Sequence, residues 1–373
     1  MIRFITKFAD TDEILQLLPA ATHIAFDSEF TRDKTYNPIL SLLQVAISYN
    51  GGKKIFIIDC LSGHGLSVEQ TAFVLEKIFN CAAIKIIHSC RQDLQIIEQF
   101  IDKSNLKNDK IADTQIMANL CGIGFNIGYS ALAQDLIDVK IDKDLQNSNW
   151  QQRPLHENQL RYVVQDVLFL EDLYNGLQDR IAEKQRGDWL LEEMQNFLNV
   201  IFRQDNANLF KNFSAAHKNK KQIILLQKLV LWREDWARKI NIPRQHLMSD
   251  DLLEKIVAQY NDTDYLLQII SSKKYDQQTR RSFFEVMDEV LNGTTAEEIV
   301  IKKLPIMNLR QKTIYLALQE IVEKNAQQQS LDPRFLLPKS QIKDIVIANK
   351  FDNILYGWRH QLLSDEMQEI LLN

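Results

Sequence analysis

Two acidic residues end an apolar run near the start of the chain. The segment IAFDSEFTRD begins like a buried strand and then places Asp27 and Glu29 one residue apart. Strand side chains alternate between faces, so these two carboxylates project from one face while Phe26, Ser28 and Phe30 project from the other. Carboxylates that close repel unless a cation, a hydrogen-bond donor or water compensates them. Such a pair alone is more typical of a solvated strand end, so further residues are needed to indicate a site.

Further candidate residues occur in two places along the chain. Asp93 follows the predicted strand AIKIIHS and lies in the first turn of a predicted helix, where an acid is also favoured for ordinary electrostatic reasons. Tyr162 and Asp166 are four positions apart in another predicted helix and therefore share a face. A tyrosine half buried against a sheet is the structural alternative for Tyr162. Each of these features is common in proteins by itself. Only their occurrence together, in this order along the chain, would indicate a specific kind of site.

The elements that must position these residues follow from hydrophobic periodicity. Strands are predicted at 22–29, 40–48, 53–59 and 83–89, and helices at 68–79 and 91–100. This order indicates a mixed sheet flanked by helices. From about residue 130 the pattern is helical, and one long helix with a broad apolar stripe is predicted over 157–181.

Composition bounds the class of protein. The chain has 373 residues, of which 45% are apolar and 25% charged, so it is expected to be globular with two or three domains. Its formal net charge of −5 argues weakly against nonspecific coating of nucleic acid. The chain has no signal-peptide pattern and no run of about 18 apolar residues, so a soluble, cytoplasmic protein without membrane contact is expected.

The four cysteines argue against two further kinds of site. Cys60, Cys81, Cys90 and Cys121 form no CxxC pair and have no matching histidine pairs. This spacing speaks against a zinc site and against a disulfide framework. The cysteines are interpreted as small buried apolar residues in a reducing compartment.

Two polar stretches divide the chain. RQDNANLFKNFSAAHKNKK indicates a boundary near 205–220. LNGTTAEEIVIKKLP indicates a second near 292–305, with Gly293 as a helix stop and Thr295 beginning a new helix. Domains are therefore expected at 1–205, 211–292 and 296–373.

The two expected C-terminal domains share a faint plan. ARKINIPRQHLMSDDLLEKIV and QQQSLDPRFLLPKSQIKDIV each have a Pro-containing turn, an apolar pair and a polar N-cap, Ser249 or Ser340, before an amphipathic helix. We interpret them as diverged repeats of one module. Residues 211–291 carry 14 basic and 11 acidic residues, so the acidic character of the chain belongs to its first half.

The motifs around the candidate residues resemble those of a known family. FDSEF followed by TYNPILSLLQVA, then HSCRQDLQII, IADTQIMANL and NWQQRPLHENQLRYVVQDVLFL are similar to the exonuclease motifs of bacterial ribonuclease D, a member of the DEDD exonuclease superfamily with a tyrosine in its third motif. LWREDWARKINIPRQHLMSDDLLEKI, DPRFLLPKSQIKDIV and ILYGWRHQLLSDEMQEIL are similar to the paired helical nucleic-acid-binding domains of that family, called HRDC. The resemblance implies an α/β ribonuclease-H-like exonuclease domain followed by two small all-α helical domains.

The resemblance also implies roles for single residues. The family's four metal-binding acids fall on Asp27, Glu29, Asp93 and Asp166, and its tyrosine falls on Tyr162. No acid is replaced, so activity is expected. The second motif departs from the family's pattern, because Arg91 and Gln92 stand where small residues are familiar.

Phosphodiester hydrolysis explains the use of such a set. Negative charge builds on the nonbridging oxygens and on the leaving 3′ oxygen, and four carboxylates can hold two divalent ions about 4 Å apart that neutralise both ends of the displacement. Oxygen ligands favour Mg²⁺ or Mn²⁺ over zinc. In this interpretation Asp27 bridges the ions, Glu29 and Asp166 complete the site of the attacking water, and Asp93 lies near the leaving group. Tyr162 orients or helps to deprotonate that water.

The expected function is therefore 3′ to 5′ trimming of structured RNA with release of 5′-mononucleotides, and tRNA precursors are the family's best-known substrates. The helical domains would hold the folded RNA while its frayed 3′ end enters the site. No obligate protein partner is inferred. Two alternatives stay open, a DNA exonuclease of proofreading or repair type and a noncatalytic RNA-binding scaffold. Retention of the acids and the tyrosine argues against the scaffold.

Four other features have structural interpretations at least as good as functional ones. A packed side chain is favoured for His88, and Trp150 and Arg153 either touch substrate or anchor their loop. Asp113 is predicted to cap the helix TQIMANL. The basic run KNKK at 218–221 is more typical of a solvated surface than of a phosphate contact.

Overall fold

The computed structural model describes residues 2–106, 110–141, 145, 148–202, 209–272, 274–293, 307–352 and 354–372. These residues form two compact units. The first combines Met1–Thr31, Leu40–Arg203 and Met307–Asn373, and the second combines Arg32–Ile39 with Gln204–Ile306. The division expected at 1–205, 211–292 and 296–373 stays a prediction, because 203–208 and 294–306, including Thr295, lie outside the described residues.

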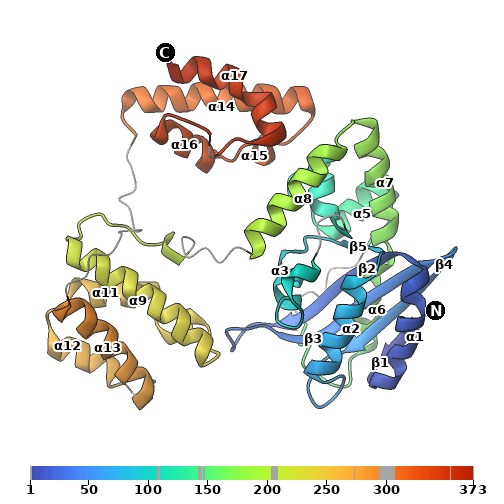
Figure 1. Ribbon diagram of the computed structural model, residues 1–373, viewed down its shortest axis with the longest axis horizontal. Helices are drawn as coiled ribbons and strands as arrows, with labels where there is room; N and C mark the ends of the chain where they lie inside the picture. The colour runs from blue at the N-terminus through green and yellow to red at the C-terminus, as the bar shows by residue number, and fades with distance from the viewer. Residues whose placement is uncertain are drawn as a thin grey trace. The chain divides into compact units, whose positions relative to one another are not determined.

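A six-stranded mixed sheet forms the centre of the first unit (Figure 1). Its strands are β1 (Ile2–Ile5), β2 (Ala21–Thr31), β3 (Ile39–Tyr49), β4 (Gly52–Asp59), β5 (Ile84–Ile87) and β6 (Ile111–Asp113), in the spatial order β1-β4-β3-β2-β5-β6. β3 and β4 are antiparallel, whereas β1 with β4, β2 with β5 and β5 with β6 are parallel. The mixed sheet predicted from the sequence is confirmed. The strands β1 and β6 were not predicted from the sequence.

Helices cover both faces of this sheet. They are α1 (Asp12–Leu17), α2 (Val68–Asn80), α3 (Arg91–Ile97), α4 (Thr114–Cys121), α5 (Tyr129–Ile137), α6 (Glu157–Leu168), α7 (Leu170–Glu183) and α8 (Gly187–Phe202). Phe26 of β2 packs in a core with residues of α2, α3 and α8. Its neighbour Ala25 packs in a second core with residues of α4 to α7. Alternate residues of β2 thus face different helical layers.

The single helix predicted over 157–181 is wrong, because α6 ends at Leu168 and α7 begins at Leu170. Side chains from elsewhere bond the carbonyls at this junction. The Tyr129 hydroxyl donates to the carbonyl of Gln165 at 2.8 Å, and Lys53 Nζ donates to that of Leu168 at 3.3 Å. Because these groups satisfy the carbonyls, the backbone can leave the helical path there. Sequence periodicity cannot reveal such partners.

A C-terminal helical region belongs to the first unit. It contains α14 (Leu309–Gln329), α15 (Pro333–Leu336), α16 (Lys339–Ala348) and α17 (Gly357–Leu372). Trp189 of α8 stacks on Trp358 of α17 with ring centroids 4.4 Å apart. Arg186 donates to the carbonyls of Leu120 and Gln329, each at 2.5 Å. These contacts join the region to α4 and α8.

The second unit contains five described helices. They are α9 (Lys220–Lys239), α10 (Arg244–Leu247), α11 (Asp250–Ala258), α12 (Thr263–Ile270) and α13 (Gln277–Asn292). Ser249 caps α11 as predicted, by accepting from the Leu252 amide. The same prediction for Ser340 is wrong, because α16 begins at Lys339 with Pro338 as its N-cap. α13 ends immediately before Gly293, as predicted.

The structure also bears on the expectations about membrane helices and cysteines. No described helix has the length and the apolar character required to cross a lipid bilayer. All four cysteines are free thiols, with Cys90 and Cys121 buried and Cys60 and Cys81 half-buried.

Candidate active site

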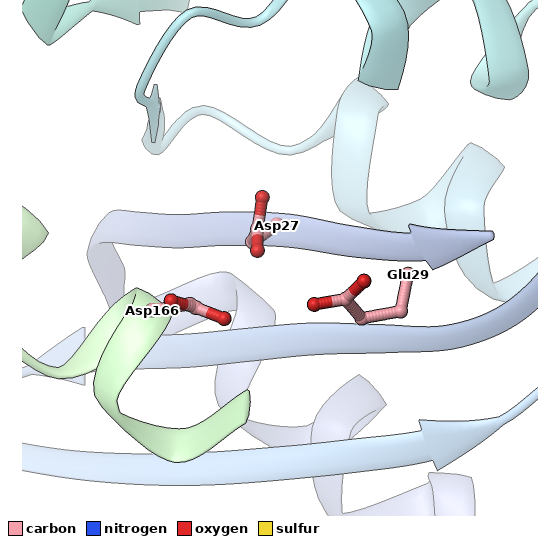
Figure 2. Close-up of side chains that lie close together, drawn as sticks. All are labelled: Asp27, Glu29 and Asp166. Atoms are coloured by element: carbon pink, nitrogen blue, oxygen red, sulfur yellow. The ribbon is translucent and has the colours of Figure 1, made fainter. Parts of the chain in front are cut away.

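Three carboxylates from two distant segments meet above the sheet. Asp27 and Glu29 come from β2, and Asp166 comes from α6, with ligand oxygens that all lie within 4.8 Å of one another. Figure 2 shows the carboxylates of Glu29 and Asp166 turned toward each other beside Asp27. α6 reaches this face of β2 because Val163 and Val167 are buried in the same core as Ala25. The shared face predicted for the two strand acids is therefore confirmed.

Asp93 reaches the same place from the other layer. It lies in the first turn of α3, directly after β5, which pairs with β2. The Ser28 hydroxyl donates to Asp93 Oδ1 at 2.5 Å. All four acids line one cavity of about 520 Å³. In the described chain, the close group of ligand oxygens contains Asp27, Glu29 and Asp166 but not Asp93. The predicted set is thus gathered, with Asp93 set slightly apart.

Burial and mutual repulsion disfavour ionisation of these acids. Burial, followed by the charges of Asp93, Asp166 and Glu29, raises the pKa of Asp27 well above its usual value. Burial, followed by neighbouring acids, raises the pKa of Glu29 to about 9 and that of Asp166 to about 8. The pKa of Asp93 rises to about 6, mainly through burial, and its hydrogen bond from Ser28 opposes the rise. The cluster therefore needs positive charge to be fully ionised near neutral pH.

The donor set fits a divalent cation. Asp166 Oδ2 is shielded from solvent and has no hydrogen-bond partner among the described residues. No lysine or arginine is among the described residues that line the cavity. Clustered carboxylate oxygens without a basic partner are the ligands that hard cations such as Mg²⁺ and Mn²⁺ prefer.

Tyr162 lines the cavity one helical turn before Asp166. Its ring lies 5.8 Å from that of buried Trp150, measured between centroids. Burial, followed by the charges of Asp166 and Glu29, raises the pKa of the Tyr162 phenol above its usual value. A neutral phenol both donates and accepts hydrogen bonds, so it can hold a water molecule beside the acids.

The structural interpretations of His88 and Asp113 are supported by their contacts. Both ring nitrogens of His88 have protein partners, the Thr114 hydroxyl at 2.9 Å and the Ile127 carbonyl at 3.1 Å. Asp113 caps α4, as predicted, by accepting from the amide of Gln115 at 2.8 Å. It also accepts from the amides of Ser89 and Cys90, so it holds the turn that precedes Asp93.

The loop that contains Trp150 and Arg153 is anchored rather than open. Arg153 pairs with Asp59 through Nε at 2.5 Å and Nη2 at 2.7 Å, and it donates to the Trp150 carbonyl at 2.8 Å. Both charged side chains are almost fully buried. In the basic run 218–221, Lys218 pairs with Glu254 at 2.9 Å and Lys221 donates to the Leu291 carbonyl, which is consistent with an ordinary surface.

Two residues at the candidate site were not predicted from the sequence. Ser28 lies between the two strand acids but points to the other face, where it bonds Asp93. Tyr129 lines the cavity and donates to the Gln165 carbonyl one residue before Asp166. Ser28 lies between the two acids of the DSE motif, so the sequence indicated only that its side chain projects from the opposite face of the strand. Nothing in the local sequence around Tyr129 indicates its partner.

Comparisons with known proteins agree with this geometry. A family described as 3′–5′ exonuclease matches residues 2–182, and the HRDC domain matches residues 222–284. Ribonuclease D of Bartonella henselae is 25% identical over 377 residues, covering 100% of this chain and 90% of that protein. Ribonuclease D of Granulibacter bethesdensis is 33% identical over 256 residues, covering 68% and 62%.

Solved structures show the same fold. The crystal structure of Escherichia coli RNase D, described as an exoribonuclease involved in structured RNA processing, has a TM-score of 0.77 at 18% identity and covers 100% of this chain and 99% of that one. The catalytic core of RRP6 from Trypanosoma brucei has a TM-score of 0.55 at 18% identity, covering 78% and 79%. With its exonuclease domain, its acidic cavity and its HRDC domain, the chain belongs to the ribonuclease D family of 3′–5′ exoribonucleases.

Proposed function

We propose that this protein trims the 3′ ends of structured RNA such as tRNA precursors and releases 5′-mononucleotides. The observation that carries the proposal is the close group of Asp27, Glu29 and Asp166, with Asp93 lining the same cavity. A binding-only surface for a polyanion gains nothing from four clustered acids. The Escherichia coli enzyme of the same fold is involved in structured RNA processing, which favours folded RNA as the substrate class.

We propose that Asp27, Glu29, Asp93 and Asp166 hold two divalent cations, Mg²⁺ or Mn²⁺. Such ions supply electrostatic neutralisation of the attacking and leaving oxygens in an in-line displacement. The resemblance to ribonuclease D would make Asp27 the ligand shared by both ions. Glu29 and Asp166 complete the side that receives water. Asp93, which comes from the opposite layer, is assigned to the leaving-group side.

The roles of the remaining residues follow from their positions. Tyr162 is proposed to hold the attacking water through its phenol oxygen, since it shares a helix face with Asp166. Ser28 is a positioning residue, because its hydroxyl fixes one oxygen of Asp93. Proton transfer or water orientation by a well-placed group contributes about 10²-fold to 10⁴-fold in rate.

The C-terminal helical region is proposed to be a second HRDC-like domain. Its order of a long helix, a four-residue helix and an amphipathic helix, α14 to α16, repeats that of α9 to α11. The sequence similarity of the two segments supports this proposal. A cytoplasmic location also stays a prediction.

Hydrolysis of a 5′-labelled RNA with a single-stranded 3′ end tests the function. In Mg²⁺ or Mn²⁺ the protein should shorten the RNA one nucleotide at a time and release 5′-mononucleotides. Asp27→Asn should remove nearly all activity and keep the fold, because the charge of the shared ligand is lost. An Asn variant with near wild-type turnover would reject the two-ion assignment.

The same experiment separates the alternatives. A DNA strand of matched sequence and 3′ end should be cut more slowly than the RNA, and faster cutting of DNA would favour a repair or proofreading exonuclease. A purified, folded protein that binds RNA yet is inactive in both Mg²⁺ and Mn²⁺ would favour the scaffold.

A further inference from the structure

A second cavity of about 660 Å³ adjoins the acid cavity within the first unit. Ser89, Gln92 and Gln115 line both cavities, so the two are adjacent. One wall of the second cavity comes from α3, α4 and α8, and the other comes from the C-terminal helical region. A chain that leaves the acids in this direction would therefore pass between the exonuclease domain and that region.

Arg91 supplies an uncompensated positive charge in this cavity. It is exposed at the first residue of α3, and its Cζ lies 5.3 Å from the centroid of the Phe197 ring. Among the described residues, no carboxylate lies within 4.0 Å of its guanidinium nitrogens. The face of the guanidinium packs on the Phe197 ring, so the N–H groups of Arg91 stay available for an anion.

Arg334 supplies a second positive charge from the opposite wall. Its Cζ lies 4.4 Å from the centroid of the Phe125 ring. Asp332 accepts from its Nε at 2.9 Å and from its Nη2 at 2.8 Å, so its charge is partly neutralised. No hydrogen bond to Nη1 is made within the described part of the chain, and this nitrogen can still contact a phosphate.

The acids of this cavity do not oppose an anion. Glu193 is paired with Arg359 of the opposite wall, and both side chains are largely buried. Asp113 is 1% exposed and accepts from four backbone amides, including those of Ser89 and Cys90. The balance of unpaired charge in the cavity is therefore positive, in contrast to the adjoining acid cavity.

Aromatic rings accompany these cations. Tyr356, which precedes α17, is 49% exposed, and the Phe125 and Phe197 rings are half-buried. Bases of single-stranded nucleic acid stack on such rings regardless of their sequence. Positive charge beside partly exposed rings is a combination that binds single strands.

The two walls are held in a definite arrangement. Besides the stack of Trp189 on Trp358, Arg359 donates to the carbonyls of Leu336 at 2.9 Å and Phe335 at 3.0 Å and to Glu193 of α8. The backbone at Gly122 packs closely on Ser330, because a Cβ added at Gly122 would lie 2.0 Å from the Ser330 carbonyl oxygen. The C-terminal region is therefore a wall of the cavity rather than a tethered module.

We propose that the second cavity binds the single-stranded RNA segment immediately 5′ of the nucleotide held by the acids. Arg91 and Arg334 contact its phosphates, and Phe125 and Tyr356 stack on its bases. The inference rests on the proposed function, because it assumes that a 3′ end lies in the acid cavity. It makes the C-terminal helical region part of the substrate path and requires a single-stranded tail of several nucleotides.

Binding and length dependence test this inference in the full-length protein. Affinity is measured by fluorescence anisotropy of a labelled hexanucleotide RNA in Ca²⁺, a cation chosen to slow hydrolysis, at several salt concentrations. Activity in Mg²⁺ is measured as kcat/KM for the hexanucleotide and for a dinucleotide. The variants are Arg91→Gln with Arg334→Gln, and Tyr356→Ala. The matched control is Arg3→Gln, an exposed arginine of β1 that pairs with Glu13 and lines neither cavity.

The double variant should bind the hexanucleotide at least about tenfold more weakly, since each arginine loses a hydrogen bond to a charged group. The slope of log affinity against log salt should fall by about 0.7 for each phosphate that the protein no longer neutralises. Tyr356→Ala should weaken binding by about 5-fold to 150-fold, because a base can no longer stack on the ring. In both variants the ratio of kcat/KM for the hexanucleotide to that for the dinucleotide should fall, while Arg3→Gln should behave as wild type.

Two results would overturn the inference. One is wild-type affinity and salt slope in the double variant and in Tyr356→Ala. The other is an equal loss on the dinucleotide and the hexanucleotide, which would indicate a defect in the acid cavity instead. Failure of the proposed function is a different observation, the absence of RNA hydrolysis by the wild-type protein. The affinity comparison in Ca²⁺ still decides the inference in that case.

Discussion

Ser28 donates a hydrogen bond of 2.5 Å to Asp93 Oδ1 and thereby joins the two layers that build the candidate active site. Asp27 and Glu29 face the layer of α6, whereas Ser28 faces the layer of α3. β2 thus positions acids on both of its faces. Asp27 and Glu29 are its own side chains, and Asp93 is held by the hydrogen bond from Ser28. The geometry of the cavity therefore depends on a residue that is not itself an acid.

Ser28→Ala should lower activity by about 10-fold to 100-fold, because residues that orient a metal ligand typically contribute that much. The loss should appear as weaker Mg²⁺ activation and be partly restored by excess Mg²⁺. The measurement is a Mg²⁺ titration of single-turnover RNA cleavage.

Ser48→Ala is the matched control for that substitution. Ser48 is also a buried serine that donates at 2.5 Å to a carboxylate, Glu171, and it does not line the acid cavity. Ser28→Ala with an unchanged Mg²⁺ profile would show that Asp93 holds its position without the hydrogen bond.

The raised pKa values of the acids predict how stability depends on pH. In the unfolded chain these groups ionise near pH 4, whereas folding raises the pKa of Asp93 to about 6, of Asp166 to about 8 and of Glu29 to about 9. Between these limits the folded state binds more protons than the unfolded state. The contribution of the cluster is therefore fully present below about pH 4 and is lost as the pH rises to about 9.

The increase in Tm on adding Mg²⁺ or Mn²⁺ should consequently grow between pH 6 and pH 9, since the cation replaces protons that the cluster otherwise retains. Thermal unfolding in EDTA and in saturating cation across this range measures it. Asp166→Asn should flatten the dependence. A cation effect on Tm that is constant with pH in the wild type would contradict binding at this cluster.

Tyr162→Phe separates a role in chemistry from a role in packing. The substitution removes only the phenol oxygen and keeps the ring against Trp150. Single-turnover cleavage of a short RNA at saturating Mg²⁺ should slow by about 10²-fold to 10⁴-fold, with RNA and Mg²⁺ binding unchanged. Tyr174→Phe, a buried tyrosine in the same core that does not line the acid cavity, should cleave normally. Unchanged cleavage by Tyr162→Phe would assign this tyrosine to packing.

Gly122→Ala should loosen the C-terminal helical region. The φ of Gly122 is +77°, and an added Cβ would lie 2.0 Å from the Ser330 carbonyl oxygen. Gly63 is a matched control, because its φ is +83° but nothing lies within 4 Å of an added Cβ. Gly63→Ala should cost only the left-handed backbone penalty, about 1–2 kcal/mol in free energy of unfolding. The cost for Gly122→Ala should be larger, as measured by chemical denaturation, and equal costs would contradict tight packing at this junction.

Local periodicity was sufficient to predict part of the fold and of the site. A strand repeats every two residues and a helix every 3.6, so the shared face of Asp27 and Glu29 and that of Tyr162 and Asp166 follow from spacing alone. The Asp113 cap follows equally from local chemistry, because the helix amides that it caps are two and three residues away. The family resemblance added the remaining assignment, that of Asp93.

Long-range contacts decided the rest, and spacing carries no information about them. The break between α6 and α7 depends on Tyr129 and Lys53, which bond carbonyls 36 and 115 positions away. The tie between Ser28 and Asp93 spans 65 positions, and the bond from Trp358 Nε1 to Glu193 spans 165. Which surfaces meet is set by burial of apolar area and pairing of polar groups across the whole fold. The sequence by itself therefore determined which residues are candidates for the chemistry, whereas the tertiary structure decided how the acids are held and that a C-terminal helical region lines the cavity beside them.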